Sequence, residues 1–375
     1  MRFTVERDVL ADAVAWTSRA VPARPPVPVL AGVRITATDE GTVRLASFDY
    51  EVSARGEFEA SVEEAGEVLV SGRLLKEIAN ALPHKPVDFT LEGTKVSVTC
   101  GASRFTLGTM PVDQYPSLPE LPEQSGTIDG SLLQQAVAQV TSAASRDETL
   151  PILTGVRVEI EGEHISLLAT DRYRLALREL TWAPTKTDIS AVALVRAKTL
   201  SDTAKALGAG EVSVALTTGE GVDLIGFEAG GLVTTSLLMD GDYPAVRRLF
   251  PESSPIKATV RTADLIEATR RVALVAERNS SVRLAFAEGE VTLDAGQTDD
   301  AQASEALTAS LDGEAITVAF NPTFLLDGLN ALGTEFVQLG FTQETKPVEF
   351  VGLSEPGGTP AGDFRYLLVP IRIAS

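Results

Sequence analysis

The amino-acid sequence predicts an α+β protein made of three tandem similar domains, each with two helices packed on antiparallel sheets. Three observations predict this class: a length of 375 residues, segments that recur about every 125 residues, and a mixture of strand-like and helix-like apolar patterns inside each recurrence. A repeat of this length is a whole domain, because solenoid repeats are only about 20 to 50 residues long.

The repeat is clearest in one helical segment, which occurs as SGRLLKEIANAL, RAKTLSDTAKAL and NPTFLLDGLNAL. These segments align without gaps over 71–82, 196–207 and 321–332, so that Leu75, Leu200 and Leu325 share a column. The short motifs GVRI, GVRV and SVRL begin at residues 32, 155 and 281 and recur with nearly the same spacing. The register therefore holds over most of each repeat.

Proline-rich polar stretches separate the recurrences. DQYPSLPELPEQSG occupies 113–126 and LFPESSPIK occupies 249–257, and both have the composition of linkers between periodic regions. The sequence therefore predicts domains over 1–120, 127–252 and 256–375.

Strands are predicted where apolar and polar residues alternate, as in FTVE, GVRITA, KVSVT, VRVEI and ITVAF. Helical spacing predicts six helices, over 6–21, 71–82, 129–145, 196–208, 261–278 and 321–333. In the last segment Asn321 is the expected N-cap and Pro322 the first helical residue, and Leu325, Leu329 and Leu332 fall on one face. We expect that face to be buried.

The charge balance argues against ordinary nucleic-acid binding. The chain has 52 acidic and 32 basic residues, a net charge of -20, and its field repels phosphate polymers. The six helical segments, however, contain 11 basic and 10 acidic residues and are nearly neutral. The acidity is therefore concentrated outside the predicted helices.

Groups that catalysis or metal binding requires are scarce. The chain has two histidines, His84 and His164, one cysteine, Cys100, and no glycine-rich phosphate-binding motif. These observations predict no enzyme, no metal site and no cofactor. The sequence also lacks an apolar run of about 18 residues and an apolar segment near its start, which favours a cytoplasmic location.

Six short segments occur in a characteristic order: MRFTVERDVL, ARPPVPVLAGVRI, LATDRYRLA, DGDYPAVRRLFP, LLDGLNAL and YLLVPIRI. With three tandem domains, they make the whole chain similar to the bacterial DNA polymerase III beta subunit, the DNA polymerase sliding clamp family. This resemblance implies the DNA clamp fold and a head-to-tail homodimeric ring that encircles duplex DNA without sequence preference. It also implies a processivity factor that slides on DNA, tethers the replicative polymerase and has no catalytic activity.

The resemblance further implies a pocket for the short clamp-binding peptides of the replicative DNA polymerase catalytic subunit, the clamp loader and other partner proteins. Carried over by position, this peptide-binding pocket consists of Leu153, Thr170, Arg172, Tyr173, Arg174, Leu175, Pro244, Arg248, Leu249, Leu367, Val369, Pro370 and Ile371. Arg172 departs from the family pattern, in which a small residue is common, and is expected to narrow the cleft.

Two further surfaces follow from the resemblance. The expected DNA-facing residues are Arg24, Arg73, Arg146, Lys198 and Lys205. The expected dimer interface joins Leu74, Ile78, Phe105 and Leu107 of the first domain to Ala273 and Leu274 of the partner's third domain, with Arg104 and Glu305 as a flanking ion pair.

Two other classes of function stay open at this point. One is a three-domain peptide-binding scaffold that does not encircle DNA, and the other is a hydrolase whose active site has no recognisable motif. The sequence also leaves open whether the protein is the housekeeping clamp or a second, inhibitor-resistant copy.

Overall fold

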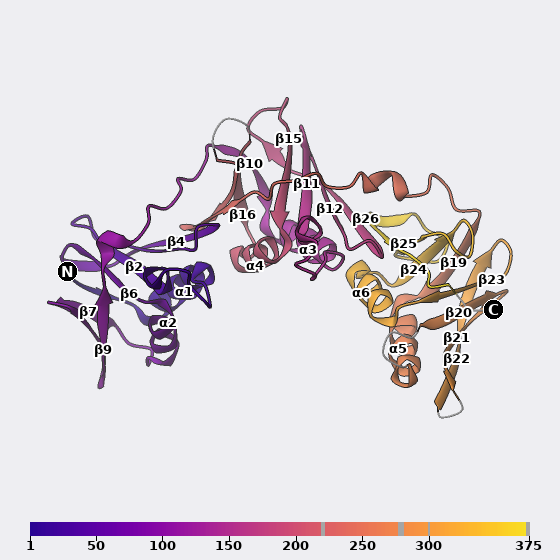
Figure 1. Cartoon of the computed structure of the whole chain (residues 1–375), viewed down its shortest axis with the longest axis horizontal. Helices are drawn as coiled ribbons and strands as arrows, with labels where there is room; N and C mark the ends of the chain where they lie inside the picture. Colours follow the sequence, from indigo (N-terminus) through magenta and orange to yellow (C-terminus); the bar gives the residue numbers. More distant parts are fainter. Residues whose placement is uncertain (219–221, 277–280, 299–300, 373–375) are drawn as a thin grey trace. The chain divides into compact units, whose positions relative to one another are not determined.

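The computed structural model (Figure 1) describes residues 1–218, 222–276, 281–298 and 301–372. These residues form two compact units. Unit 1 comprises Met1–Ser131, Ala183–Thr187 and Asp202–Leu238. Unit 2 comprises Leu132–Trp182, Asp188–Ser201 and Met239–Ser375. The central repeat thus contributes strands to both units, and the predicted domain ranges stay predictions.

All six predicted helices are present, each a few residues shorter than its predicted segment. They are α1 (Arg7–Thr17), α2 (Gly72–Ala81), α3 (Gly130–Thr141), α4 (Ala197–Leu207), α5 (Thr262–Val272) and α6 (Pro322–Leu332). In unit 1, α1 lies beside α2, and in unit 2, α5 lies beside α6 (Figure 1). In the described part of the chain no helix has the length and apolarity needed to cross a membrane.

The strands of unit 1 pair antiparallel in the order β14-β10-β16-β17-β18-β4-β3-β2-β6-β9-β8-β7-β1-β5. Their bounds are β1 (Arg2–Val5), β2 (Gly32–Ala37), β3 (Thr42–Phe48), β4 (Val52–Glu59), β5 (Ser61–Glu64), β6 (Gly66–Ser71), β7 (Val87–Glu92), β8 (Lys95–Cys100), β9 (Ser103–Met110), β10 (Gln124–Asp129), β14 (Ala183–Pro184), β16 (Glu211–Thr217), β17 (Leu224–Ala229) and β18 (Leu232–Leu237).

The strands of unit 2 pair antiparallel in the order β15-β11-β12-β13-β26-β25-β24-β19-β22-β21-β20-β23. Their bounds are β11 (Gly155–Glu161), β12 (His164–Thr170), β13 (Arg174–Thr181), β15 (Ser190–Arg196), β19 (Ile256–Arg261), β20 (Val282–Ala287), β21 (Glu290–Thr298), β22 (Ala301–Asp312), β23 (Ile316–Phe320), β24 (Phe336–Phe341), β25 (Val348–Leu353) and β26 (Pro360–Leu368).

Local sequence explains the last helix. The Asn321 side chain accepts hydrogen bonds from the backbone N–H groups of Thr323 and Phe324, at 2.9 and 3.3 Å, and Pro322 is the first helical residue. Gly333 ends the helix with φ 65°, a conformation that glycine adopts without strain. The predicted apolar face, Leu325, Leu329 and Leu332, is buried.

Two strand pairings join neighbouring repeats in the same way. In unit 1, β18 pairs with β4 so that Leu232 faces Gly56; in unit 2, β26 pairs with β13 so that Phe364 faces Arg178. The repeat makes these two pairings equivalent, and their registers coincide. Sheets therefore continue from one repeat into the next, which is why the compact units do not follow the repeats.

Candidate functional site

The hairpin turn between β12 and β13 is built around Asp171. Its Oδ1 accepts hydrogen bonds from the backbone N–H groups of Tyr173 and Arg174, at 3.0 and 3.1 Å. The Thr170 hydroxyl donates to the Arg174 carbonyl at 2.6 Å. Arg172 has φ 79°, in the left-handed region that non-glycine residues seldom adopt. The turn therefore presents the side chains of Arg172 and Tyr173 to solvent.

Arg174 is buried in this turn and fully engaged within unit 2. Its Nε donates to Asp171 Oδ2 at 2.9 Å and its Nη1 to Asp327 Oδ2 on α6 at 2.6 Å. The guanidinium also lies 4.3 Å from the ring centroid of Phe324. Burial alone lowers the pKa of Arg174, but the facing groups Tyr366, Asp327 and Asp171 outweigh it and raise the pKa. The side chain is therefore a permanent cation that fixes the turn against α6.

An apolar cluster lies next to the turn. Leu175 on β13 faces Leu367 on β26, and both side chains are buried. The cluster contains Leu153, Leu168, Leu175, Leu177, Leu194, Tyr243, Val246, Phe250 and Leu367. Three expected pocket residues, Leu153, Leu175 and Leu367, are thus buried in this apolar cluster and expose little surface to a ligand.

The accessible part of the expected pocket is its rim. Tyr173 and Leu249 are 54% and 53% exposed, and Val369 and Ile371 are 37% and 39% exposed. Pro244, Arg172 and Arg248 are also exposed, whereas Pro370 is half-buried. Four large apolar side chains open to solvent around a buried apolar floor are typical of a surface that receives apolar anchors.

The chain end is tied to this rim through backbone hydrogen bonds. The Val369 N–H donates to the Tyr173 carbonyl at 2.9 Å, and the Ile371 N–H donates to the Ala319 carbonyl at 2.7 Å. The segment after β26 is therefore an ordered wall of the site in which Val369 and Ile371 are held by their own backbones.

Sequence reasoning missed several residues that position the site. The hydroxyl of Tyr243 accepts a hydrogen bond from the Thr170 N–H at 3.0 Å, and burial raises the pKa of Tyr243 to about 12. Asp327 and Phe324 hold Arg174, and Tyr366 donates to the Phe324 carbonyl at 2.9 Å. QYP and DYP occur near the ends of the first and second predicted domains, and this repeated motif is the sequence signal that could have identified Tyr243.

The five residues expected to face DNA are all exposed. Arg73 lies on α2 and pairs with Glu77 one turn later at 3.0 Å, while Lys198 and Lys205 lie on α4. Arg24 and Arg146 lie in the segments that follow η1 (Ser18–Ala20) and α3. Their exposure is compatible with a contact to DNA and equally with solvation.

The expected dimer residues differ in accessibility. Leu274, in η6 (Ala273–Val275), is 84% exposed, and Leu74 and Phe105 are also exposed. Ile78 and Ala273 are half-buried. Leu107 belongs to the buried core of unit 1, so its side chain has little surface left for the contact with a partner that was expected of it.

The expected ion pair of Glu305 with Arg104 has a competitor inside unit 2. Arg271 on α5 donates from Nη2 and Nε to the two carboxylate oxygens of Glu305, at 2.6 and 3.0 Å. This pairing lowers the pKa of Glu305. An intermolecular pair with Arg104 would have to share or replace it.

β9 and β22 each have an unpaired edge over part of their length in the described residues. β9 pairs with β8 over Ser103–Gly108 on one side, and β22 pairs with β21 over 301–308 on one side. No described strand lies on the other side of either segment. Such edges readily accept a strand from another chain.

The chain matches three family models in succession. They describe the N-terminal, central and C-terminal domains of the DNA polymerase III beta subunit, and they cover residues 1–119, 127–245 and 247–368. Among proteins of similar sequence, the beta sliding clamp of Streptomyces coelicolor is 54% identical over 100% of both chains. The beta sliding clamp homolog GriR of Streptomyces muensis is 45% identical over 99% of both chains.

Solved structures agree with these matches. The DNA polymerase sliding clamp of Bacillus subtilis superposes with a TM-score of 0.91 at 27% identity and covers 100% of both chains. The sliding clamp of Pseudomonas aeruginosa bound to griselimycin also has a TM-score of 0.91, at 27% identity and with 100% of both chains covered.

Proposed function

Because the chain belongs to the DNA polymerase III beta-subunit family of sliding clamps, we propose that two copies close head to tail into a ring around duplex DNA. The protein is a processivity factor of DNA replication and not an enzyme, and its partners include a second copy, DNA and the polymerase. We expect it to act in the cytoplasm, where bacterial DNA is replicated.

The observation that carries ring closure is the pair of free strand edges. Within the chain, neighbouring repeats are joined by a strand pairing, which we call an internal joint. Each internal joint pairs the last strand of one repeat with the fourth strand of the preceding repeat, as β18 does with β4 and β26 with β13. Only β9 of the first repeat and β22 of the third lack such a partner in the described residues. A second copy supplies both missing pairings, because its β22 can pair with β9 and its β9 with β22.

The internal joints also predict the register of the joint between copies. When the repeats are matched through their strand pairings, Leu232 of the second repeat occupies the position of Ser103 in the first. In the same way, Gly56 of the first repeat occupies the position of Glu305 in the third. Because Leu232 faces Gly56, we expect Ser103 to face the partner's Glu305, and Arg104 to face the partner's Ser304. Arg104 then lies one residue from the carboxylate with which it was expected to pair.

Encirclement accounts for DNA retention by an acidic protein. A closed ring leaves DNA only by opening or by sliding off an end, so its contacts with phosphates need little intrinsic affinity. The nearly neutral helices, with Arg73, Lys198 and Lys205 exposed on α2 and α4, suit weak and salt-screened contacts better than tight binding.

We further propose that the rim of Tyr173, Leu249, Val369 and Ile371 binds the clamp-binding peptides of the polymerase, the clamp loader and other partners. A leucine or aromatic side chain buried there gains roughly 1.5 to 3 kcal/mol. Exposed Arg172 and Arg248 flank the apolar rim and are suited to acidic or backbone groups of the peptide.

The decisive experiment is loading onto nicked circular DNA followed by gel filtration. A ring clamp is expected to stay with the circle in about 0.5 M salt, a concentration that screens electrostatic contacts. It should be released when a restriction enzyme linearises the DNA. A three-domain peptide-binding scaffold without encirclement would show the same retention before and after cleavage, and that outcome would overturn the proposal.

A further inference from the structure

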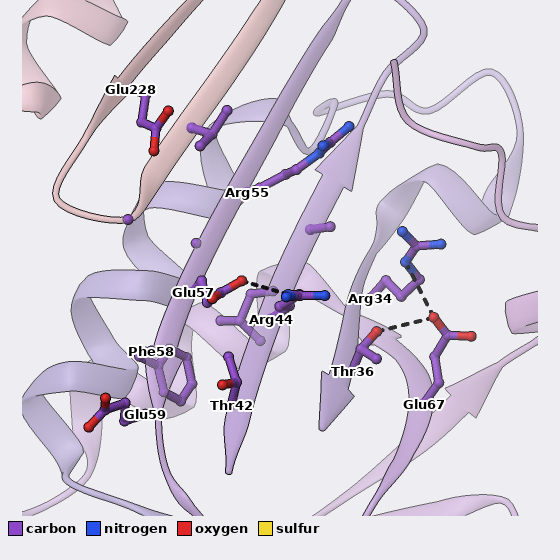
Figure 2. A pocket seen from close by; sticks show the side chains of 15 residues that line it. Arg34, Thr36, Thr42, Arg44, Arg55, Glu57, Phe58, Glu59, Glu67 and Glu228 are labelled. Atoms are coloured by element: carbon purple, nitrogen blue, oxygen red, sulfur yellow. Dashed lines mark hydrogen bonds and ion pairs between the residues drawn. The ribbon is translucent and has the colours of Figure 1, made fainter. Parts of the chain in front are cut away.

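Unit 1 has a hollow of about 790 Å³ on the face of the first repeat's sheet that points away from α1 and α2 (Figure 2). The first repeat supplies most of its lining, and Glu228, Gly231 and Val233 of the second repeat supply the rest. The strand register explains it. Arg34 on β2, Ala46 on β3 and Arg55 on β4 lie directly opposite one another, so their side chains share one face. The methyl group of Ala46 between two long arginine side chains leaves the space open.

In the part of the chain that the structure describes, two of the three arginines in the hollow form ion pairs, and the third does not. Arg44 donates to Glu57 at 2.5 Å, and Arg34 lies 3.5 Å from Glu67 (Figure 2). Arg55, in contrast, donates to the backbone carbonyl of Pro119 and makes no ion pair among the described residues. Burial and the neighbouring Arg34 lower the pKa of Arg55, and the carboxylate of Glu120 offsets only part of this shift. A half-buried guanidinium beside a like charge is stabilised by an added anion.

In the second repeat the chain itself covers the next row of side chains on this face, the row that corresponds to Thr36, Arg44 and Glu57 of the first repeat. There Glu159 on β11, Ser166 on β12 and Glu179 on β13 form one row, and Arg247 from η5 (Val246–Leu249) bridges the two carboxylates. Arg247 donates to Glu179 at 2.8 Å and to Glu159 at 3.2 Å. In the second repeat, therefore, the linker that follows the domain covers this face with a charged group of the chain itself.

In the first repeat, the side chains on this face differ in charge and size. The repeat register puts Arg44 where the second repeat has Ser166, and Arg55 and Ala46 where it has Leu177 and Leu168. Two positions thus change from uncharged to cationic, and one bulky side chain is replaced by a methyl group. The cations Arg34 and Arg55 on either side of the small Ala46 favour an anion as the group that fills this hollow.

We propose that this hollow is a docking site for a partner protein through a short peptide segment whose aspartate or glutamate carboxylate lies between Arg34 and Arg55 above Ala46. The volume is in the range of pockets that hold a few residues, not a folded domain. Glu57, Glu59, Glu67 and Glu228 also line the hollow and repel a polyanion such as nucleic acid. One carboxylate flanked by apolar residues is the occupant that suits both features.

The test is fluorescence anisotropy of the full chain with a labelled, acetylated pentapeptide that has a central glutamate flanked by leucines. We expect saturable binding that weakens at least about tenfold when the glutamate is replaced by glutamine, since a charge-assisted pair contributes about 1.5 to 3 kcal/mol. Arg55→Met should weaken binding similarly. Arg2→Met, which changes an exposed arginine paired with Glu63, should leave binding unchanged.

Ala46→Leu provides a second variant that keeps every charge. It fills the hollow with the residue that the second repeat carries at the equivalent position, Leu168, and should abolish binding without lowering the melting temperature. Equal binding by Ala46→Leu, equal binding of the glutamine peptide, or no saturable binding up to millimolar peptide would overturn the proposal. Stronger competition by a single-stranded oligonucleotide than by the acidic peptide would also overturn it.

Discussion

Arg174 on β13 and Asp327 on α6 are separated by 153 residues in the chain and joined by an ion pair of 2.6 Å. The same guanidinium holds Asp171, so one buried cation fixes both the hairpin turn and the helix beside it. In the proposed peptide binding we therefore expect Arg174 to position Tyr173 and Arg172, and the exposed rim to contact the peptide.

We predict that Arg174→Met destabilises unit 2 by about 3 kcal/mol, because it removes a buried cation and leaves the partly buried carboxylates of Asp171 and Asp327 without their partner. Urea unfolding followed by fluorescence measures this loss as an earlier transition. Arg2→Met removes an exposed arginine and should shift the transition by less than about 0.5 kcal/mol. Equal transitions for the two variants would show that the Arg174 network contributes no stability.

We predict that Val369→Ser combined with Ile371→Ser weakens a labelled clamp-binding peptide about 10- to 100-fold, through loss of apolar contact. Substitution is preferable to truncation after Leu367, because Leu368 is buried in β26 and its removal would disturb the sheet. Anisotropy measures the affinity, and retention on circular DNA should be unchanged. Undiminished peptide affinity would place the pocket elsewhere.

We predict that Leu274→Asp yields a folded monomer. The Leu274 side chain is 84% exposed in the single chain, so a charge there costs the fold little, but it would be buried without a partner in an apolar joint. Sedimentation velocity distinguishes monomer from dimer. Val192→Asp, at a residue that is 52% exposed outside the proposed joint, is the control and should remain dimeric. A dimeric Leu274→Asp protein would contradict the assignment of this surface.

The predicted register between copies is tested by paired cysteines. Arg104→Cys with Ser304→Cys should form an intermolecular disulfide, because opposed residues of antiparallel strands have Cα atoms about 4.5 to 5.5 Å apart, within disulfide reach. Arg104→Cys with Ala303→Cys places the thiols on opposite faces and should not crosslink. The native Cys100 is buried and gives little background in non-reducing electrophoresis. Crosslinking of only the second pair would mean a register shifted by one residue.

We predict a loss of stability at alkaline pH that depends on Tyr243. The pKa of Tyr243, about 12, exceeds the ordinary value of 10.0. The stability that its neutral hydroxyl contributes to the folded state is therefore fully present below pH 10 and is lost as the pH rises towards 12. Thermal melts between pH 9 and 12 should show a smaller decline in Tyr243→Phe than in the wild type, by up to about 2 kcal/mol. Tyr50→Phe, at an exposed tyrosine, should decline as the wild type does.

The sequence alone determined the features that depend on short-range patterns. The 125-residue repeat, the six helices, the Asn321 cap and the buried column of Leu75, Leu200 and Leu325 could all be predicted, because periodicity and capping act over a few residues. The family could also be inferred from the sequence, since its motifs occur in order along the chain.

Only the tertiary structure decided which side chains of those motifs are available. It placed Arg174 against Asp327, Thr170 against Tyr243, and Arg34 and Arg55 on either side of Ala46. Each of these relationships depends on strand register or on packing between distant segments. Alternation along a strand predicts two faces but not the neighbour that each face meets, and that neighbour determines whether an arginine is a structural cation or an open binding group.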